Sequence, residues 1–435
     1  MIHTNKAQHR VVITGMGVVA PNAIGLSDFE QALRAGKSGI RHFEQLEALQ
    51  FGCQLGGQPD IPTETMEAYF SPLEIKSLKA SGVIYGVLAG LMAWEDAGLQ
   101  RPIDRTQEPF WESGCIFGAG LAGAEVIREA TYLIDGKKVK RLGSTTVPQV
   151  MSSGVSAYLG GRLGLGNQVS TNASACSTGS ESILMAAEQI QLGKAQRMLC
   201  GGCDSSGPYV WGGFDAMRVT NRKSNAQPTA ASRPMSATAA GFVPGSGAGA
   251  LVLESLESAL ERNARIYGEV LGGAINSGGQ QQGGTMTAPN KSGIVRCIKQ
   301  ALDATQIKPQ EIDAISGHLT STMFDPIEIE QWSIALQRKG SDFPFINSTK
   351  SLIGHCLSAA GAIESVALVL ELFHGFLHPS INCEDLHPQI EAQIDRACIP
   401  MEVQNVELNI VAKSSFGFGD VNSCVLFGKY AHKKI

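Results

Sequence analysis

Short apolar runs rich in β-branched residues alternate along this chain with longer Ala- and Leu-rich stretches that have helical periodicity. The expected strands are Val11–Gly15, Cys115–Gly118, Met198–Gly201, Ala250–Glu254, Tyr267–Gly272, Ile312–Ser316, Phe345–Ser348, Ile410–Lys413 and Cys424–Phe427. The expected helices are Ser81–Ala97, Glu181–Leu192, Ser292–Ala304, Pro326–Gln337 and Ala359–Phe373. This alternation predicts stacked α/β layers with largely parallel strands and right-handed crossovers.

The same alternation occurs in both parts of the chain. With 435 residues the chain suits two α/β units better than one. A charged helical segment, Ser255–Arg265, follows the strand that ends near Glu254. We therefore predict two halves, residues 1–255 and 256–435.

Composition excludes several classes of protein. The net charge of −5 argues against a dedicated nucleic-acid binder. Ten cysteines without regular spacing do not indicate a disulfide framework. Met1–Arg10 is polar, unlike a signal peptide. The longest apolar run, Val83–Trp94, falls short of the roughly 20 residues that cross a bilayer. We expect a cytoplasmic protein without a membrane span.

One cysteine lies in a setting that suits a nucleophile. Small residues flank Cys176 in Asn172–Gly179, and a helix is expected just after it. The positive end of a helix dipole favours a thiolate, and small neighbours leave room for a substrate. The alternative is a buried, inert cysteine, which is the commoner case.

Two histidines occupy similar junctions between a strand and a helix. His318 follows the expected strand Ile312–Ser316, and His355 lies five residues after Lys350. Loops at such junctions build the sites of α/β proteins. A lone histidine is more often structural, but a cysteine and two histidines at three equivalent junctions indicate one catalytic site.

Four linked motifs resemble those of β-ketoacyl-acyl-carrier-protein synthases. They are Asn172–Gly179, His318-x-Thr320-x-Thr322, Lys350-Ser-x-x-Gly-His355 and Phe416-Gly-Phe418-Gly419. The resemblance extends over nearly the whole chain and is strongest to the homodimeric type II elongating enzymes. It implies a thiolase-like α/β fold, in which two halves related by a pseudo-twofold axis stack as αβαβα layers. The first half would carry the nucleophile and the second both histidines.

The resemblance also implies a reaction and the residues that perform it. Cys176 would accept an acyl group from a carrier, and His318 and His355 would bind the malonyl thioester during decarboxylation. Claisen condensation would then give a 3-oxoacyl-carrier. Lys350 and Glu364 would orient the histidines, and Phe418 would be the gate between the acyl and malonyl sites. Thr320 and Thr322 would contact the pantetheine arm, and Leu121 would lie at the acyl-chain pocket.

The same resemblance implies an acyl carrier protein as partner, no metal, and no cofactor beyond the 4′-phosphopantetheine that the carrier brings. An acidic carrier needs a basic dock. The densest basic cluster is Lys137, Lys138, Lys140 and Arg141, and Lys76, Lys79 and Arg218 align near the family's dock. The alternative is an ordinary solvated loop. We expect a homodimer, with a heterodimer as the alternative.

Several positions depart from the common family pattern. Leu319 replaces a glycine beside the first histidine, and Asp420 replaces a glycine in the gate loop. The run from His318 to Asp325 is one residue short, and Met235–Ala240 lacks the usual charges. The loop Asn276–Gly284 is also unusual. These changes lead to the hypothesis of a specialised pathway, such as aryl-polyene or resorcinol-type pigment synthesis.

Competing interpretations remain. Gly118-x-Gly120-x-x-Gly123 fits a dinucleotide fingerprint, but no acidic residue ends a second strand at the required spacing. Cys200 and Cys203 resemble half a zinc site without its second half. A thiolase would use a second cysteine near the C-terminus. A non-catalytic partner subunit would normally lack the nucleophile, which this chain retains.

Overall fold

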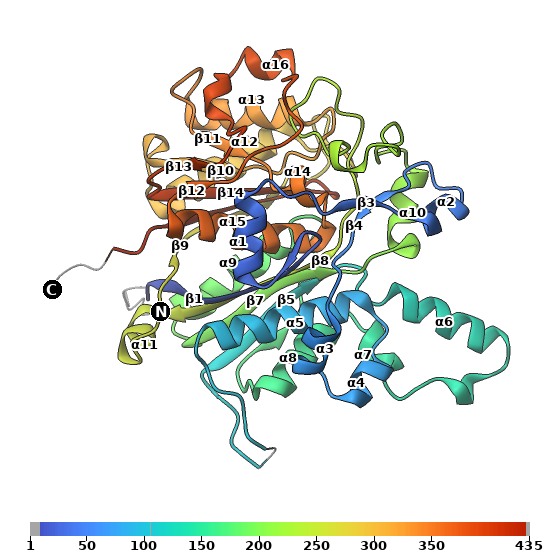
Figure 1. Ribbon diagram of the computed structural model, residues 1–435. Coiled ribbons are helices and arrows are strands. Elements are labelled where there is room, and N and C mark those ends of the chain that lie inside the picture. Colours follow the sequence, from blue (N-terminus) through green and yellow to red (C-terminus); the bar gives the residue numbers. More distant parts are fainter. Residues whose placement is uncertain (1–8, 105, 432–435) are drawn as a thin grey trace.

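The computed structural model describes residues 9–104 and 106–431, so most of the predicted polar N-terminus lies outside the described residues. One mixed sheet of eleven strands organises the fold (Figure 1). Its path runs β11-β10-β14-β15-β9-β1-β8-β7-β5-β6, with β2 (Ala23–Ile24) paired to β1.

Each half of the chain contributes five strands in the same spatial order. The first five are β1 (Val11–Ala20), β5 (Ser113–Ala119), β6 (Val169–Ser170), β7 (Arg197–Asp204) and β8 (Gly247–Ser255). The second five are β9 (Gly268–Ser277), β10 (Ala314–Ser316), β11 (Phe345–Asn347), β14 (Ile410–Gly417) and β15 (Val421–Gly428). When the strands of each set are numbered along the chain, their spatial order across the sheet is first, fifth, fourth, second, third. This repeated order supports two halves; the boundary between residues 255 and 256 stays a prediction.

The expectation of largely parallel pairing is wrong. β5 pairs in parallel with β6 and β7, and β10 pairs in parallel with β11 and β14. The other ladders of the two sets, including β14 with β15 and β7 with β8, are antiparallel. A parallel pair needs a crossover connection of a dozen or more residues, whereas only residues 418–420 join β14 to β15.

Helices form three layers around the strands (Figure 1). α5 (Ser81–Asp96) and α8 (Gly154–Leu163) cover the outer face of the first set. α9 (Thr178–Gln191) and α15 (Ala360–His374) contact strands of both sets and form the central layer. α12 (Lys291–Thr305) packs on β9 and β15 and contacts α13 (Asp325–Leu336) on the far side. The result is the predicted αβαβα stack.

The central helix α15 is apolar on all sides because strands cover it from both faces. Among the described residues, one 18-residue segment, Leu357–His374, is long and apolar enough to cross a bilayer, and 89% of it is buried inside the fold. Burial of this extent is typical of a core helix.

Shorter elements connect and flank these layers. The helices are α1 (Leu26–Arg34), α2 (Glu44–Ala48), α3 (Thr63–Tyr69), α4 (Pro72–Ser77), α6 (Ala124–Asp135), α7 (Thr146–Val150), α10 (Pro208–Ala216), α11 (Leu256–Glu261), α14 (Lys350–Ile353) and α16 (Pro388–Glu391). The strands are β3 (Ile40–His42), β4 (Leu55–Gly57), β12 (Phe376–Leu377) and β13 (Gln404–Asn405). α6 and the turn after it project from the body as an arm (Figure 1).

Candidate active site

Cys176 lies on a tight turn that leads into α9. Ala175 before it has a left-handed backbone, with φ of 49°, which is uncommon for any residue other than glycine. The Ser177 hydroxyl donates to the carbonyl oxygen of Ser415 at 3.1 Å, which ties this turn to β14 of the other half. The turn presents the sulfur to a cavity while the side chain stays 9% exposed.

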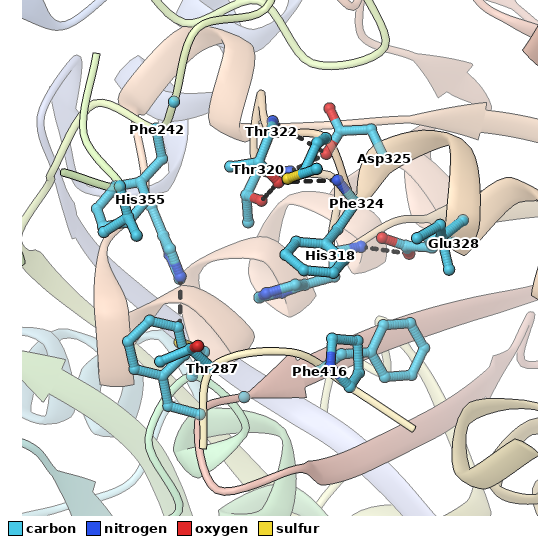
Figure 2. Close-up of a pocket in the computed structure, with 18 of the residues that line it drawn as sticks. Phe242, Thr287, His318, Thr320, Thr322, Phe324, Asp325, Glu328, His355 and Phe416 are labelled. Carbon is cyan, nitrogen blue, oxygen red and sulfur yellow. Dashed lines mark hydrogen bonds between the residues drawn. The ribbon is translucent and has the colours of Figure 1, made fainter. Parts of the chain in front are cut away.

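His355 follows α14 and contacts Cys176 directly. Its Nε2 lies 3.1 Å from the cysteine Sγ, as the dashed line in Figure 2 shows. Its Nδ1 lies 3.3 Å from the backbone nitrogen of Leu357 and accepts that N–H. A neutral imidazole has one proton, so this hydrogen bond assigns the proton to Nε2.

His318 approaches the same sulfur from the end of β10. The backbone N–H of His318 donates to the Glu328 carboxylate at 2.7 Å (Figure 2). The backbone N–H of Leu319 donates to the same carboxylate at 2.7 Å, and the two bonds fix this turn. The His318 and His355 rings meet edge to face, with centroids 5.3 Å apart. Within the described chain, the buried Nδ1 of His318 has no hydrogen-bond partner. One donor atom from each of Cys176, His318 and His355 lies within 4.8 Å of the others.

Both histidines are held neutral. Burial lowers the pKa of His318 and of His355 well below the ordinary value of 6.5, because water no longer solvates the charged ring. The positive charges of Lys350 and Lys413 lower both pKa values further. A neutral ring still has one N–H group with which it can donate a hydrogen bond to a substrate.

The expectation of a resting thiolate is not supported. Burial raises the pKa of Cys176 to about 11, while Lys350 and the backbone N–H of Phe418 pull it down. The loss of water around the sulfur therefore outweighs these two favourable contributions. The thiol is protonated at rest.

A buried carboxylate links two lysines behind the histidines. Oε1 of Glu364 lies 2.6 Å from Nζ of Lys350, and Oε2 lies 2.9 Å from Nζ of Lys413. All three side chains are at most 1% exposed. Lys350 and Glu364 are among the predicted site residues, whereas Lys413 is not. A lysine inside the apolar strand Ile410–Lys413 was the available signal, since charged residues are seldom fully buried unless paired.

A cavity of about 360 Å³ opens over the sulfur. Seven of the predicted site residues line it: Cys176, Arg218, His318, Thr320, Thr322, His355 and Phe418. The Thr320 and Thr322 hydroxyl oxygens lie 3.0 Å apart on one wall (Figure 2). Most of the other wall is aromatic or apolar, which suits an acyl thioester arm.

Other predicted residues lie elsewhere. Leu121 is 53% exposed and is not among the described residues that line the cavity, so this single chain does not place it at an acyl pocket. The basic cluster Lys137, Lys138, Lys140 and Arg141 follows α6 on the projecting arm, away from the cavity lining. Of the predicted docking residues in the described chain, Arg218 alone reaches the cavity.

Two departures from the family pattern do not face the substrate space. The Leu319 side chain is 1% exposed and packs in the core with Ile315 and Ile329, because its backbone turns it away from the cavity. Asp420 is also buried, and its carboxylate bonds to a neighbouring loop. Ala239 and Ala240, by contrast, line the cavity.

The motifs that resemble a dinucleotide fingerprint and half a zinc site have structural explanations. Cys200 and Cys203 are buried in β7, and all ten cysteines are free. A Cβ at Gly118 would lie 2.2 Å from the Thr178 side chain, so this glycine permits close packing of β5 against α9. The Cys–His–His cluster has nitrogen and sulfur donors of the kind that zinc accepts. The expectation of no metal therefore stays a prediction.

A cysteine and two neutral histidines at the junction of duplicated α/β halves define a thiolase-like condensing enzyme. The model of the β-ketoacyl synthase N-terminal domain matches residues 8–259, and that of the C-terminal domain matches residues 267–384. The chain therefore belongs to the β-ketoacyl synthase family, as its motifs predicted.

Relatives match the chain along most of its length. The chloroplastic 3-oxoacyl-[acyl-carrier-protein] synthase I of Arabidopsis thaliana is 35% identical over 97% of this chain and 87% of its own. The 3-oxoacyl-[acyl-carrier-protein] synthase 2 of Coxiella burnetii is 33% identical over 97% of this chain and 99% of its own.

Solved structures agree with the fold. The AntDE:AntF complex, a type II polyketide synthase acyl-carrier protein with its ketosynthase bound to the hexaketide, matches with a TM-score of 0.85. Its identity is 29%, over 97% of this chain and all of that chain. The ishigamide ketosynthase/chain length factor matches with a TM-score of 0.85 at 28% identity, over 98% of this chain and 100% of that chain.

Proposed function

We propose that this chain is a 3-oxoacyl-acyl-carrier-protein synthase, which condenses an acyl-carrier with a malonyl-carrier and releases CO₂. The observation that carries the proposal is one cavity in which a cysteine thiol meets two neutral imidazoles, with a backbone N–H on the sulfur. Names of the relatives, which are 3-oxoacyl-[acyl-carrier-protein] synthases, support the same reaction.

The first step is acyl transfer to Cys176. Its sulfur attacks the acyl thioester, the bond to the carrier sulfur breaks, and the thiol proton leaves with the departing carrier thiol. The developing oxyanion is stabilised by backbone N–H groups of Cys176 and Phe418. The Phe418 backbone N–H lies close enough to the Cys176 sulfur to lower the pKa of that thiol.

The second step is decarboxylation of the malonyl-carrier. The bond between the α-carbon and its carboxylate breaks, CO₂ leaves, and the electron pair forms an enolate. His355, protonated on Nε2, and His318 donate hydrogen bonds to the enolate oxygen. The carbon then attacks the acyl-cysteine, so that a carbon–carbon bond forms and the carbon–sulfur bond breaks. A proton taken up from solvent restores the thiol.

The partner is an acyl carrier protein, and its 4′-phosphopantetheine arm is the only prosthetic group that this scheme uses. Thr320 and Thr322 provide hydroxyl groups along the cavity, and Arg218 provides a positive charge. A structural neighbour that binds an acyl-carrier protein supports this partner. The histidines supply the electrophilic assistance, so the scheme routes no step through a metal.

The assembly we propose is a homodimer, with a heterodimer as the alternative. The location we propose is the cytoplasm. Exposed apolar side chains on the arm support a subunit interface. They are Ile127, Tyr132 and Ile134, which are 49%, 65% and 50% exposed.

Within the family we retain the hypothesis of a specialised pathway. Equal turnover of ordinary saturated acyl chains and rescue of a strain that lacks its housekeeping elongation enzyme would contradict it.

A non-catalytic partner subunit is the second candidate, and the intact site argues against it. The deciding experiment incubates the protein with malonyl-carrier and a panel of acyl-carriers. CO₂ release and intact mass are followed beside a Cys176→Ala control. Acylation of the wild type alone, followed by a 3-oxoacyl product, is the expected result. No acylation by saturated, unsaturated or aryl-primed chains would reject the synthase.

A further inference from the structure

Asp420 lies at the tip of the hairpin between β14 and β15. Both Gly419 and Asp420 have left-handed backbones, with φ of 89° and 62°. Glycine adopts this conformation without cost, whereas a residue with a side chain is strained there. The Asp420 side chain is nevertheless 1% exposed, so the strain must be offset by contacts of its carboxylate.

The carboxylate binds the loop that precedes α12. Its Oδ2 accepts the backbone N–H of Gln280 at 2.9 Å, and its Oδ1 accepts that of Asn290 at 2.8 Å. Charge-assisted bonds of this kind are among the stronger hydrogen bonds in proteins. Asn290 in turn caps the N-terminus of α12. The hairpin tip is therefore fixed to a rigid helix.

The loop is built around this carboxylate. A Cβ on Gly278 would lie 2.3 Å from Oδ2 of Asp420, and one on Gly284 would lie 2.6 Å from it. Two departures from the family pattern, the loop Asn276–Gly284 and Asp420, are thus two sides of one contact. A glycine at position 420 would provide neither hydrogen bond.

The same hairpin carries Phe418, two residues before Asp420. Phe418 lines the cavity together with Cys176, and its backbone N–H lowers the pKa of the Cys176 thiol. The Gly419 N–H donates to the Met286 carbonyl at 2.8 Å, and the adjacent Thr287 also lines the cavity. The hairpin and the segment 278–290 therefore form one side of the cavity together.

We infer that Asp420 is a positioning residue that clamps the hairpin tip to the segment 278–290 and holds Phe418 in place beside Cys176. Displacement of Phe418 to admit a bulky acyl chain then requires the two bonds of this clamp to break. The statement about acyl chains rests on the proposed function, whereas the clamp itself does not.

The test compares Asp420→Gly and Asp420→Asn with the wild type by hydrogen–deuterium exchange. We expect the amides of Gln280 and Asn290 to exchange about tenfold faster in Asp420→Gly, because local opening no longer breaks these bonds. Asp420→Asn keeps the side-chain size but loses one acceptor oxygen, so a smaller increase is expected and measurable even where the glycine variant folds poorly. Ser277→Ala is the matched control, because it removes a hydrogen bond to Gly279 in the same loop without touching Asp420.

A second measurement tests the gate. The rate of Cys176 acylation is followed by intact mass with an acetyl and with a bulky acyl-carrier. The ratio of bulky to acetyl loading should rise about tenfold in Asp420→Gly, as expected for loss of a hydrogen-bonded restraint. Unchanged amide exchange in both variants would overturn the clamp, and an unchanged loading ratio would overturn the gate. Wild-type protein that loads no acyl group would refute the proposed function, while the exchange data would still test the clamp.

Discussion

The Nε2 of His355 lies 3.1 Å from the Sγ of Cys176 and carries the single proton of that ring, because Nδ1 accepts the Leu357 N–H. In this tautomer Nε2 cannot also take the thiol proton. His355 is therefore a hydrogen-bond donor toward the sulfur and toward any oxygen that enters the cavity. The proton of the thiol must leave by another route, and the departing carrier thiol is the acceptor we favour.

The first prediction concerns the reactivity of the thiol. A pKa raised from 9.0 to about 11 means that the thiolate fraction grows as pH rises toward 11. The rate of alkylation of Cys176 by iodoacetamide should therefore climb about tenfold per pH unit between about pH 7 and 10, without a plateau near 8.5. Cys176→Ala gives the background. Lys350→Met should slow the reaction further, because the lysine lowers this pKa. A plateau below about pH 8 would show that the thiolate is present at rest.

The second prediction separates the two chemical steps. His318→Ala should reduce CO₂ release from malonyl-carrier about 10²- to 10³-fold, the usual cost of removing one donor from a developing oxyanion. Acylation of Cys176 should persist, because the backbone N–H of Phe418 on the sulfur is unaffected. His374→Ala removes a surface histidine paired with Glu30 and serves as the control. Equal loss of both steps would assign His318 to acyl transfer as well.

The third prediction concerns the buried charges. Glu364→Gln leaves two lysines without their shared carboxylate, so the free energy of unfolding should fall by about 3–5 kcal/mol. Lys413→Met should cost less, because the Lys350–Glu364 pair remains intact at 2.6 Å. Urea unfolding of the two variants measures the difference. The reverse ranking would mean that Lys413, not Glu364, anchors the group.

The sequence predicted the elements and the chemical centre well for identifiable reasons. Strong periodicity placed the helix Ser81–Ala97 within one residue of α5, Ser81–Asp96. Linked motifs brought Cys176, His318 and His355 to one site.

The features that the sequence did not predict depend on the three-dimensional surroundings of each residue. The thiolate was expected from a helix terminus, but the degree of burial that raises the pKa of Cys176 is a tertiary property. Lys413 lies in a short apolar strand, and its face of the sheet is set by pairing with β10 and β15. Likewise, the directions of the Leu319 and Asp420 side chains follow from backbone conformations that no sequence spacing encodes. At β14 and β15 the strand direction was wrong because a connection of three residues forces an antiparallel pair.

The last prediction concerns the carrier dock. Arg218 lines the cavity, whereas Lys138 and Arg141 lie on an arm whose neighbouring apolar side chains suit a subunit interface. Arg218→Glu should therefore raise the KM for malonyl-carrier about five- to tenfold at low salt, with kcat unchanged, because a charge at the rim acts on encounter. The effect should shrink as ionic strength rises. Lys138→Glu/Arg141→Glu should leave this KM unchanged and weaken dimerisation instead, measured by sedimentation. A larger rise in KM from the arm variant than from Arg218→Glu would move the dock to the arm, as the charge cluster in the sequence first indicated.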